Sequence, residues 1–252
     1  MTVDAAEETP PPSALRADAE TALRTLAGIC LAGALAGIAV GGVGGRLAMM
    51  LLARLNPYAT GVKSDDGFII GHLTLSGTLS LIVVCLFLGV LGALVYAVVR
   101  SLRSGPRWFQ LLSISVGPAV VVGGILVHTD GVDFTTLEPA LLAVALFVLI
   151  PGVYSLVLTL LAEGWVGHSG WCQRVRLRYA ALPLLVFAPG FFLLILLVPL
   201  VMLWFALRKV RTTPRGAAIL DHPAGAWVAR GGLTAIFIIS AVGLAGDVAD
   251  LT

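Results

Sequence analysis

The stretch that decides the fold runs from residue 26 to residue 55 and reads LAGICLAGALAGIAVGGVGGRLAMMLLARL. It carries a glycine at every fourth position: Gly33, Gly37, Gly41 and Gly45. On an α-helix this spacing puts all four on one face, although each glycine costs about 1 kcal/mol relative to alanine in a helix interior. Inside a bilayer such a stripe is useful, because a face without side chains lets a second helix backbone approach closely. We therefore expect a membrane helix that packs against a partner helix, either in this chain or in another.

The composition is typical of a membrane protein. Of the 252 residues, 58% are hydrophobic and 12% are charged, whereas a soluble domain carries about 25% charged residues. This small number of charges cannot cover a water-facing surface. Much of the surface must therefore face lipid. This excludes a single soluble core, and the net charge of +2 is too small to indicate a nucleic-acid partner.

Six segments have the roughly 20 apolar residues that a helix needs to span a bilayer. They are residues 26–45, 79–99, 108–127, 139–161, 180–206 and 228–248. No other stretch reaches the size of a soluble domain. We therefore expect an all-α bundle of about six transmembrane helices, with a disordered acidic and proline-rich tail at 1–23 and a single transmembrane domain at 24–252.

Arginine and lysine in the short loops predict the orientation. Three arginines follow the second segment and three follow the fourth: Arg100, Arg103, Arg107, Arg174, Arg176 and Arg178. The loop 128–138 has neither arginine nor lysine, so it is expected outside and the N-terminus in the cytoplasm. The preference for Arg over Lys, with many Ala, Gly, Val and Leu, is typical of a GC-rich bacterial genome and predicts the bacterial cell membrane as the location.

The basic stretch 208–215 breaks this pattern, because six spans would place it outside. Either four basic residues are tolerated there, or the segment 180–206 re-enters the membrane without crossing it. That segment contains Pro183, Pro189 and Pro199, and re-entrant backbone is allowed where protein or water satisfies it. The re-entrant alternative puts the C-terminus outside.

Two arginines in the first segment are candidate contacts for an anion or a lipid headgroup. Arg46 directly follows the glycine stripe, and Arg54 lies about two turns further on. A charge in an apolar helix costs several kcal/mol near the bilayer centre and less at its edge. Arg46 lies roughly 33 Å along the helix from Arg24, which places it near the far interface. The simpler interpretation is that both arginines snorkel to that interface.

Acidic residues gather in the two loops that we expect outside. Asp65 and Asp66 lie in the first of these loops, and Asp130 and Asp133 lie in the second. In the second loop, His128, Asp130 and Asp133, with Glu138 following, could hold a divalent cation. If the two loops converged, their acids and His72 could act on a lipid headgroup, and this requires the loops to lie within about 15 Å of one another. The spacing matches no metal motif, so the simpler interpretation is a set of solvated acids, and we expect no metal and no cofactor.

The longest loop between segments, 56–77, contains the turn signature Asp65-Asp66-Gly67. Its apolar stretches 68–70 and 73–75 could pair as a short hairpin. An amphipathic cap lying on the membrane is the alternative.

Two short strings match those of intramembrane proteases. Gly167-His168-Ser169-Gly170 matches the serine string of rhomboid-type enzymes, and Gly246-Asp247 matches part of the aspartyl-protease string. No apolar segment has a histidine in its middle, and none has a second aspartate, so we do not expect proteolysis. Glu163 closes the fourth segment beside Trp165, where a helix-end anchor is a simpler role than a proton relay.

Five short stretches carry a resemblance to uncharacterised multi-pass membrane proteins of actinobacteria. They are GGVGGRLAM (41–49), NP (56–57), SDDGF (64–68), TLSGTL (74–79) and VDF (132–134). The resemblance implies a membrane location, and it implies no activity, substrate or functional residue.

Three functions remain open. The leading hypothesis is a non-enzymatic accessory or assembly subunit that acts through helix–helix packing, with a second copy or another membrane protein as its partner in the bilayer. The second is a small transporter or channel for a neutral or lipid-like solute, because prolines that interrupt membrane helices are typical of midplane sites; these are Pro118, Pro151, Pro189 and Pro199. The third is a membrane-embedded lipid-modifying enzyme that uses Arg46 and the outer acids.

Overall fold

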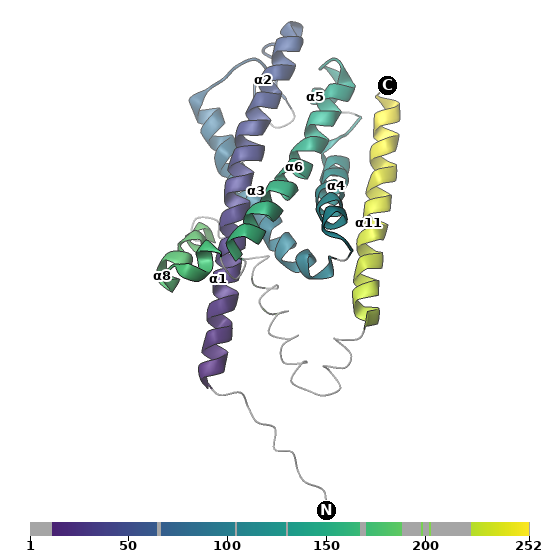
Figure 1. The fold of residues 1–252 in the computed structure, drawn as a ribbon. Helices are drawn as coiled ribbons and strands as arrows, with labels where there is room; N and C mark the ends of the chain where they lie inside the picture. Colours follow the sequence, from purple (N-terminus) through teal and green to yellow (C-terminus); the bar gives the residue numbers. More distant parts are fainter. Residues whose placement is uncertain are drawn as a thin grey trace, which may run out of the picture.

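The computed structural model describes residues 12 to 251 with gaps at 65–66, 104, 130, 167–169, 188–197, 199–201 and 203–222. Within these residues the chain is an all-α bundle of membrane helices, which confirms the predicted fold class (Figure 1). Five described helices are long and apolar enough to cross a membrane: Ala19–Leu55, Leu75–Leu102, Arg107–Leu126, Ala140–Val166 and Trp227–Asp250.

These five helices are built from the following elements. The first combines α1 (Pro12–Ala36), the π-helix η1 (Gly37–Gly44) and α2 (Gly45–Leu55). The others are α3 (Leu75–Val99) with the 3₁₀ turn η3 (Arg100–Leu102), α4 (Arg107–Leu126), α6 (Ala140–Val166) and α11 (Pro223–Asp250). Shorter elements connect them: η2 (Pro57–Ala59), α5 (Val132–Thr135), α7 (Trp171–Arg174), α8 (Leu177–Ala180) and η4 (Leu182–Phe187).

The first helix is continuous and longer than the sequence predicts. The backbone keeps right-handed helical angles at Ala36, Gly44 and Gly45, where one helix type passes into the next. The helix begins at Pro12, so residues 12–23, expected to be disordered, extend it. At 1.5 Å per residue, residues 12–55 span about 66 Å, roughly twice the hydrocarbon thickness of a bilayer. The helix therefore continues well beyond the membrane.

Three glycines of the predicted stripe form the seam between this helix and α3. A Cβ on Gly37 would overlap the carbonyl oxygen of Cys85 and lie 2.9 Å from the Cα of Gly89. Gly33 is equally close to the carbonyl oxygen of Gly89, and Gly41 lies against the side chain of Cys85. The helix that the glycine stripe receives is therefore α3 of the same chain.

Gly45 does not make the close contact that the four-residue spacing predicts for it. A Cβ there would meet only Leu81, at 4.0 Å, whereas Gly42, outside the stripe, would meet Ile82 at 3.1 Å. The cause is the π-helix η1, which lies between the two ends of the stripe. Its hydrogen bonds join residues i and i+5, so each turn holds more residues than in an α-helix, and a spacing of four no longer returns to the same face.

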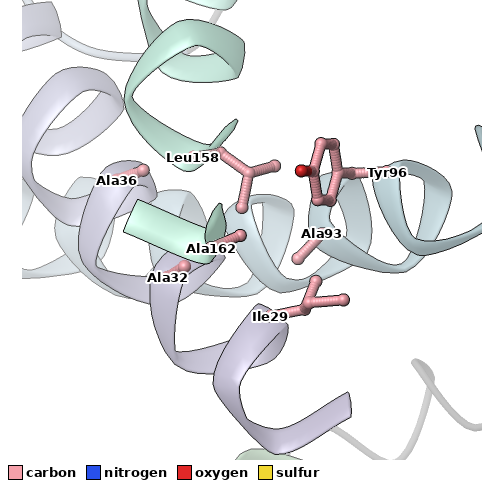
Figure 2. Packing of buried hydrophobic residues seen from close by; sticks show 7 residues of the cluster. All are labelled: Ile29, Ala32, Ala36, Ala93, Tyr96, Leu158 and Ala162. Carbon is pink, nitrogen blue, oxygen red and sulfur yellow. The ribbon is translucent and has the colours of Figure 1, made fainter. Parts of the chain in front are cut away.

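Small residues and hydrogen bonds hold three helices together beside this seam. Tyr154 of α6 donates its hydroxyl to the carbonyl oxygen of Gly89 at 2.6 Å, and its ring covers Gly92. Lipid gives no hydrophobic drive for helices to associate, so close packing and such bonds must do so. The buried cluster where α1, α3 and α6 meet is shown in Figure 2 and consists of Ile29, Ala32, Ala36, Ala93, Tyr96, Leu158 and Ala162.

We call the end of the bundle where α2 ends and α3 begins the distal end, and the opposite end the basal end. At the basal end, Arg230 near the start of α11 donates its Nε to the carbonyl oxygen of Leu102 at 3.0 Å. Near the end of α11, Leu244 and Val248 pack on the distal cluster that contains Leu52. The last helix therefore runs from the basal to the distal end, beside α4 (Figure 1).

This course of α11 departs from six single crossings. Six crossings would return the C-terminus to the end where α1 begins, but the C-terminal end of α11 lies at the distal end (Figure 1). The described residues contain five helices that are long and apolar enough to cross, rather than six. The expected fifth segment, 180–206, lies outside the described residues apart from 180–187, Val198 and Met202.

The basal end is held by an ion-pair cluster. Glu163, in the last turn of α6, accepts from Arg103 Nη1 at 2.6 Å and from Arg107 Nη2 at 3.4 Å. Arg103 also lies over the ring of Tyr96, 5.7 Å from its centroid. These contacts place Glu163 as an anchor between α6 and the α3–α4 turn.

Candidate functional site

Residues 56–74 fold over the distal end, and we call this segment the cap. A short antiparallel pairing shapes it: Gly61 N donates to Ile70 O at 3.0 Å, and Ser64 N donates to Phe68 O at 2.8 Å. The turn after Ser64 is closed by Gly67, which has a φ of +82°, a left-handed angle that glycine adopts at no steric cost. The signature at 65–67 thus marks a turn, although Asp65 and Asp66 lie outside the described residues.

One of the two alternatives that the sequence leaves open for this loop, a hairpin between 68–70 and 73–75, is wrong in its pairing. Residues 68–70 pair with the preceding stretch 61–64 and not with 73–75. The segment 73–75 instead leads into α3, where the Thr74 side chain accepts a hydrogen bond from Gly77 N at 3.2 Å and caps the helix.

Asn56 fastens the cap to the start of α6. Its side chain is fully buried. The amide nitrogen donates to the carbonyl oxygens of Leu52 and Glu138, both at 2.9 Å, and the amide oxygen accepts from Glu138 N at 2.7 Å and from Tyr58 OH at 2.6 Å. This one side chain therefore joins the end of α2, the cap and the loop before α6.

A pocket of about 360 Å³ lies between α2, the cap and α6. Five polar side chains line it: Arg46, Arg54, Thr60, Ser64 and His72. The rest of its wall is mostly apolar and includes Met49, Met50, Leu52, Ile70, Leu137 and Phe147. An apolar hollow with a few polar groups is the usual form of a small-molecule site.

Arg46 is buried in the wall of this pocket, with 8% of the residue exposed. Its guanidinium lies over the ring of Phe68, 4.7 Å from the centroid, and its Nη1 is 3.9 Å from the sulfur of Met49. Its Nε has no hydrogen-bond partner, and no carboxylate of the described residues forms an ion pair with it. A snorkelling arginine extends into water at the interface, and this side chain does not.

These contacts do not compensate the charge. An arginine stays protonated when it is buried, and removing its charge from water costs several kcal/mol. A desolvated cation–π contact returns about 2 kcal/mol, less than this cost, and a thioether is a weak acceptor. Among the described residues the guanidinium therefore retains an unmet demand for an acceptor, and most strongly for an anion.

Ser64 brings a second unused polar group to the same pocket. The residue is 9% exposed, and its hydroxyl oxygen has no hydrogen-bond partner. Its backbone NH is already used in the cap, where it donates to Phe68 O. Arg46 Nε and Ser64 Oγ are the two buried side-chain polar atoms without a partner in the described part of the chain, and both residues line one pocket.

The second predicted arginine, Arg54, also lines the pocket but is exposed at its rim. Both arginines that the sequence singles out thus belong to one site, in different roles. Arg46 is covered by protein, whereas Arg54 remains open to the exterior of the chain.

The two loops with the outer acids lie against one another, as the hydrogen bonds between Asn56 and Glu138 show. Asp65, Asp66 and Asp130 lie outside the described residues, and so does the side chain of Asp133. The acidic cluster therefore stays a prediction. In the residues that are described, no three acidic, histidine or cysteine side chains come together as a metal site would require.

The described residues add no support for either of the two protease strings. Gly167, His168 and Ser169 lie outside the described residues. Asp247 is half-buried in the last turn of α11.

Sequence reasoning missed Asn56, Ser64 and Phe68 as parts of the site. A signal for Asn56 was present, because Asn-Pro favours the start of a turn. Nothing local identified the other two, since their roles depend on the fold of the cap over α2. No family model, curated protein or solved structure matches this chain.

Proposed function

We propose that this chain is a membrane protein that binds a lipid-like solute at the distal end of its helix bundle, as a small transporter does in its binding step. The observation that carries the proposal is the apolar pocket of about 360 Å³ between α2, α6 and the cap. The pocket lies at the end of the membrane helices, so we expect its apolar wall to lie at the depth of the lipid chains. A few polar groups at one wall complete a site for an amphiphile.

The structure weakens the main support for an assembly subunit. The glycine stripe is filled by α3, so it offers no free groove to another protein. The exposed apolar side chains of α11, such as Ile239 and Val242, are what lipid contact requires. A lipid-modifying enzyme would need the outer acids, which lie outside the described residues.

We place the protein in a bacterial cell membrane with the N-terminus in the cytoplasm. Arg100, Arg103 and Arg107 lie at the turn between α3 and α4, which is at the basal end. The positive-inside rule then assigns the basal end to the cytoplasm. On this proposal the pocket opens at the outer half of the membrane.

Filling the pocket tests the proposal. We expect wild-type protein, purified in polymer-excised discs of native lipid, to carry one class of small molecule or lipid far above its share of the bulk membrane. Ala53→Trp places a large ring in the pocket wall and should remove that enrichment. Mass spectrometry of the extracted molecules measures it.

The matched control is Ala235→Trp, at an exposed position of α11, which should keep the enriched molecule. The proposal is wrong if all three proteins carry only the bulk lipid mixture. A stoichiometric protein partner without an enriched solute would restore the assembly-subunit hypothesis.

A further inference from the structure

We infer that the solute carries an acidic group, a phosphate or a carboxylate, which binds between the guanidinium of Arg46 and the hydroxyl of Ser64; this rests on the proposed lipid-like solute. Both residues line the pocket, and both have a buried polar atom without a partner. Both of these unpaired groups can donate a hydrogen bond. One anionic acceptor would satisfy both.

The chemistry of Arg46 selects the class of group. A guanidinium presents its N–H donors in a planar fork that fits the oxygens of a phosphate or a carboxylate. Here Nε is free, and the Nη1 contact to the Met49 sulfur is long, at 3.9 Å. The Phe68 ring lies against the guanidinium, 4.7 Å from its centroid, and a guanidinium that stacks on an aromatic face can still donate through the edge of its planar fork.

The surroundings of Arg46 select an amphiphile over a free ion. Apolar side chains of α2, the cap and α6 form most of the pocket beside the arginine, among them Leu52, Ile70 and Phe147. A small anion would leave this apolar volume unfilled. A hydrocarbon chain attached to the anion would occupy it, and Arg54 at the rim would attract the approaching charge.

Four probes distinguish the sources of the acidic group. Full-length protein in discs of phosphatidylcholine is titrated by calorimetry with dioctanoyl phosphatidate, octanoate, dioctanoylglycerol and inorganic phosphate. We expect the phosphatidate or octanoate to bind at least tenfold more tightly than the neutral dioctanoylglycerol. Inorganic phosphate should bind at least tenfold more weakly than the phosphatidate.

Arg46→Gln should weaken the binding of the tighter acidic probe at least tenfold, and Ser64→Ala by about threefold. Binding of dioctanoylglycerol should not change. Arg46→Lys keeps the charge and loses the fork, so it should fall between wild type and Arg46→Gln. The control Arg176→Gln, at an exposed basal arginine, should bind like wild type.

Thermal unfolding without a probe separates a ligand site from a structural charge. No described carboxylate pairs with Arg46, and burying its charge costs more than the cation–π contact to Phe68 returns, so Arg46→Gln should unfold at or above the wild-type temperature. A markedly lower temperature would show that Arg46 pairs within the chain and would overturn the inference.

The remaining outcomes test the acidic group and the lipid-like solute separately. Equal binding of dioctanoylglycerol and phosphatidate, unaffected by Arg46→Gln, would overturn the acidic group and leave the lipid-like solute standing. Inorganic phosphate binding as tightly as phosphatidate would leave the anion site and overturn the lipid-like solute. No binding of any probe would overturn both.

Discussion

Gly37→Ala is expected to destabilise the bundle by about 3 kcal/mol, because overpacking into a rigid contact costs at least 1–3 kcal/mol. The new Cβ would overlap the carbonyl oxygen of Cys85 and lie 2.9 Å from the Cα of Gly89. Both obstacles are backbone atoms, so no side-chain rotation relieves them, and α1 must move away from α3. For a chain of this size we expect the unfolding temperature in detergent to fall by about 10 °C.

Two control variants replace a different glycine by alanine. Gly243→Ala adds a methyl group where nothing lies within 4 Å, and Gly45→Ala adds one that meets only Leu81 at 4.0 Å. Both should stay within about 1 kcal/mol of wild type, since alanine favours a helix over glycine by about that amount. If Gly45→Ala were as damaging as Gly37→Ala, the stripe would pack along its whole length and the π-helical register would be wrong.

Asn56→Leu is expected to cost about 3 kcal/mol and to loosen the cap. The substitution leaves the backbone NH and carbonyl of Glu138 without their partner, and each buried group left unpaired costs about 1–3 kcal/mol. Thermal unfolding measures the loss of stability. Hydrogen–deuterium exchange should rise across the cap, whose attachment to α6 depends on this side chain.

Tyr58→Phe is the matched control for Asn56. It removes one of the four hydrogen bonds, at a residue that is 64% exposed, so we expect at most about 1 kcal/mol. An Asn56→Leu protein with wild-type exchange in the cap would show that the cap is held by other contacts.

The sequence predicted the membrane helices well because their signal is local. A run of about 20 apolar residues spans a bilayer whatever its neighbours do. The glycine stripe also predicted a close helix contact, which α3 makes at Gly33, Gly37 and Gly41. The close contact predicted at Gly45 was wrong because the prediction assumed an α-helical period. The π-helix η1 raises the number of residues per turn.

The number of crossings could not be read from apolarity alone. The basic stretch 208–215 had already conflicted with six spans. Among the described residues, α6 ends and α11 begins at the same, basal end, whereas a single crossing between them would put these two helix ends at opposite ends of the bundle.

The site depended on contacts between distant parts of the chain. Arg46 was a candidate from its charge, yet its burial follows from the cap, whose fold rests on the turn at Gly67 and on Asn56 bonding to Glu138. Ser64 is an ordinary loop serine in the sequence. Only the folded cap places it in the same pocket as Arg46.

The most direct test of the account is an experimental density map of the full chain in discs of native lipid. We expect non-protein density in the pocket between α2, α6 and the cap, with its polar end within hydrogen-bond distance of Arg46 Nε. A map in which the pocket is empty or filled by the chain itself, with Arg46 paired to a carboxylate of the protein, would contradict the account.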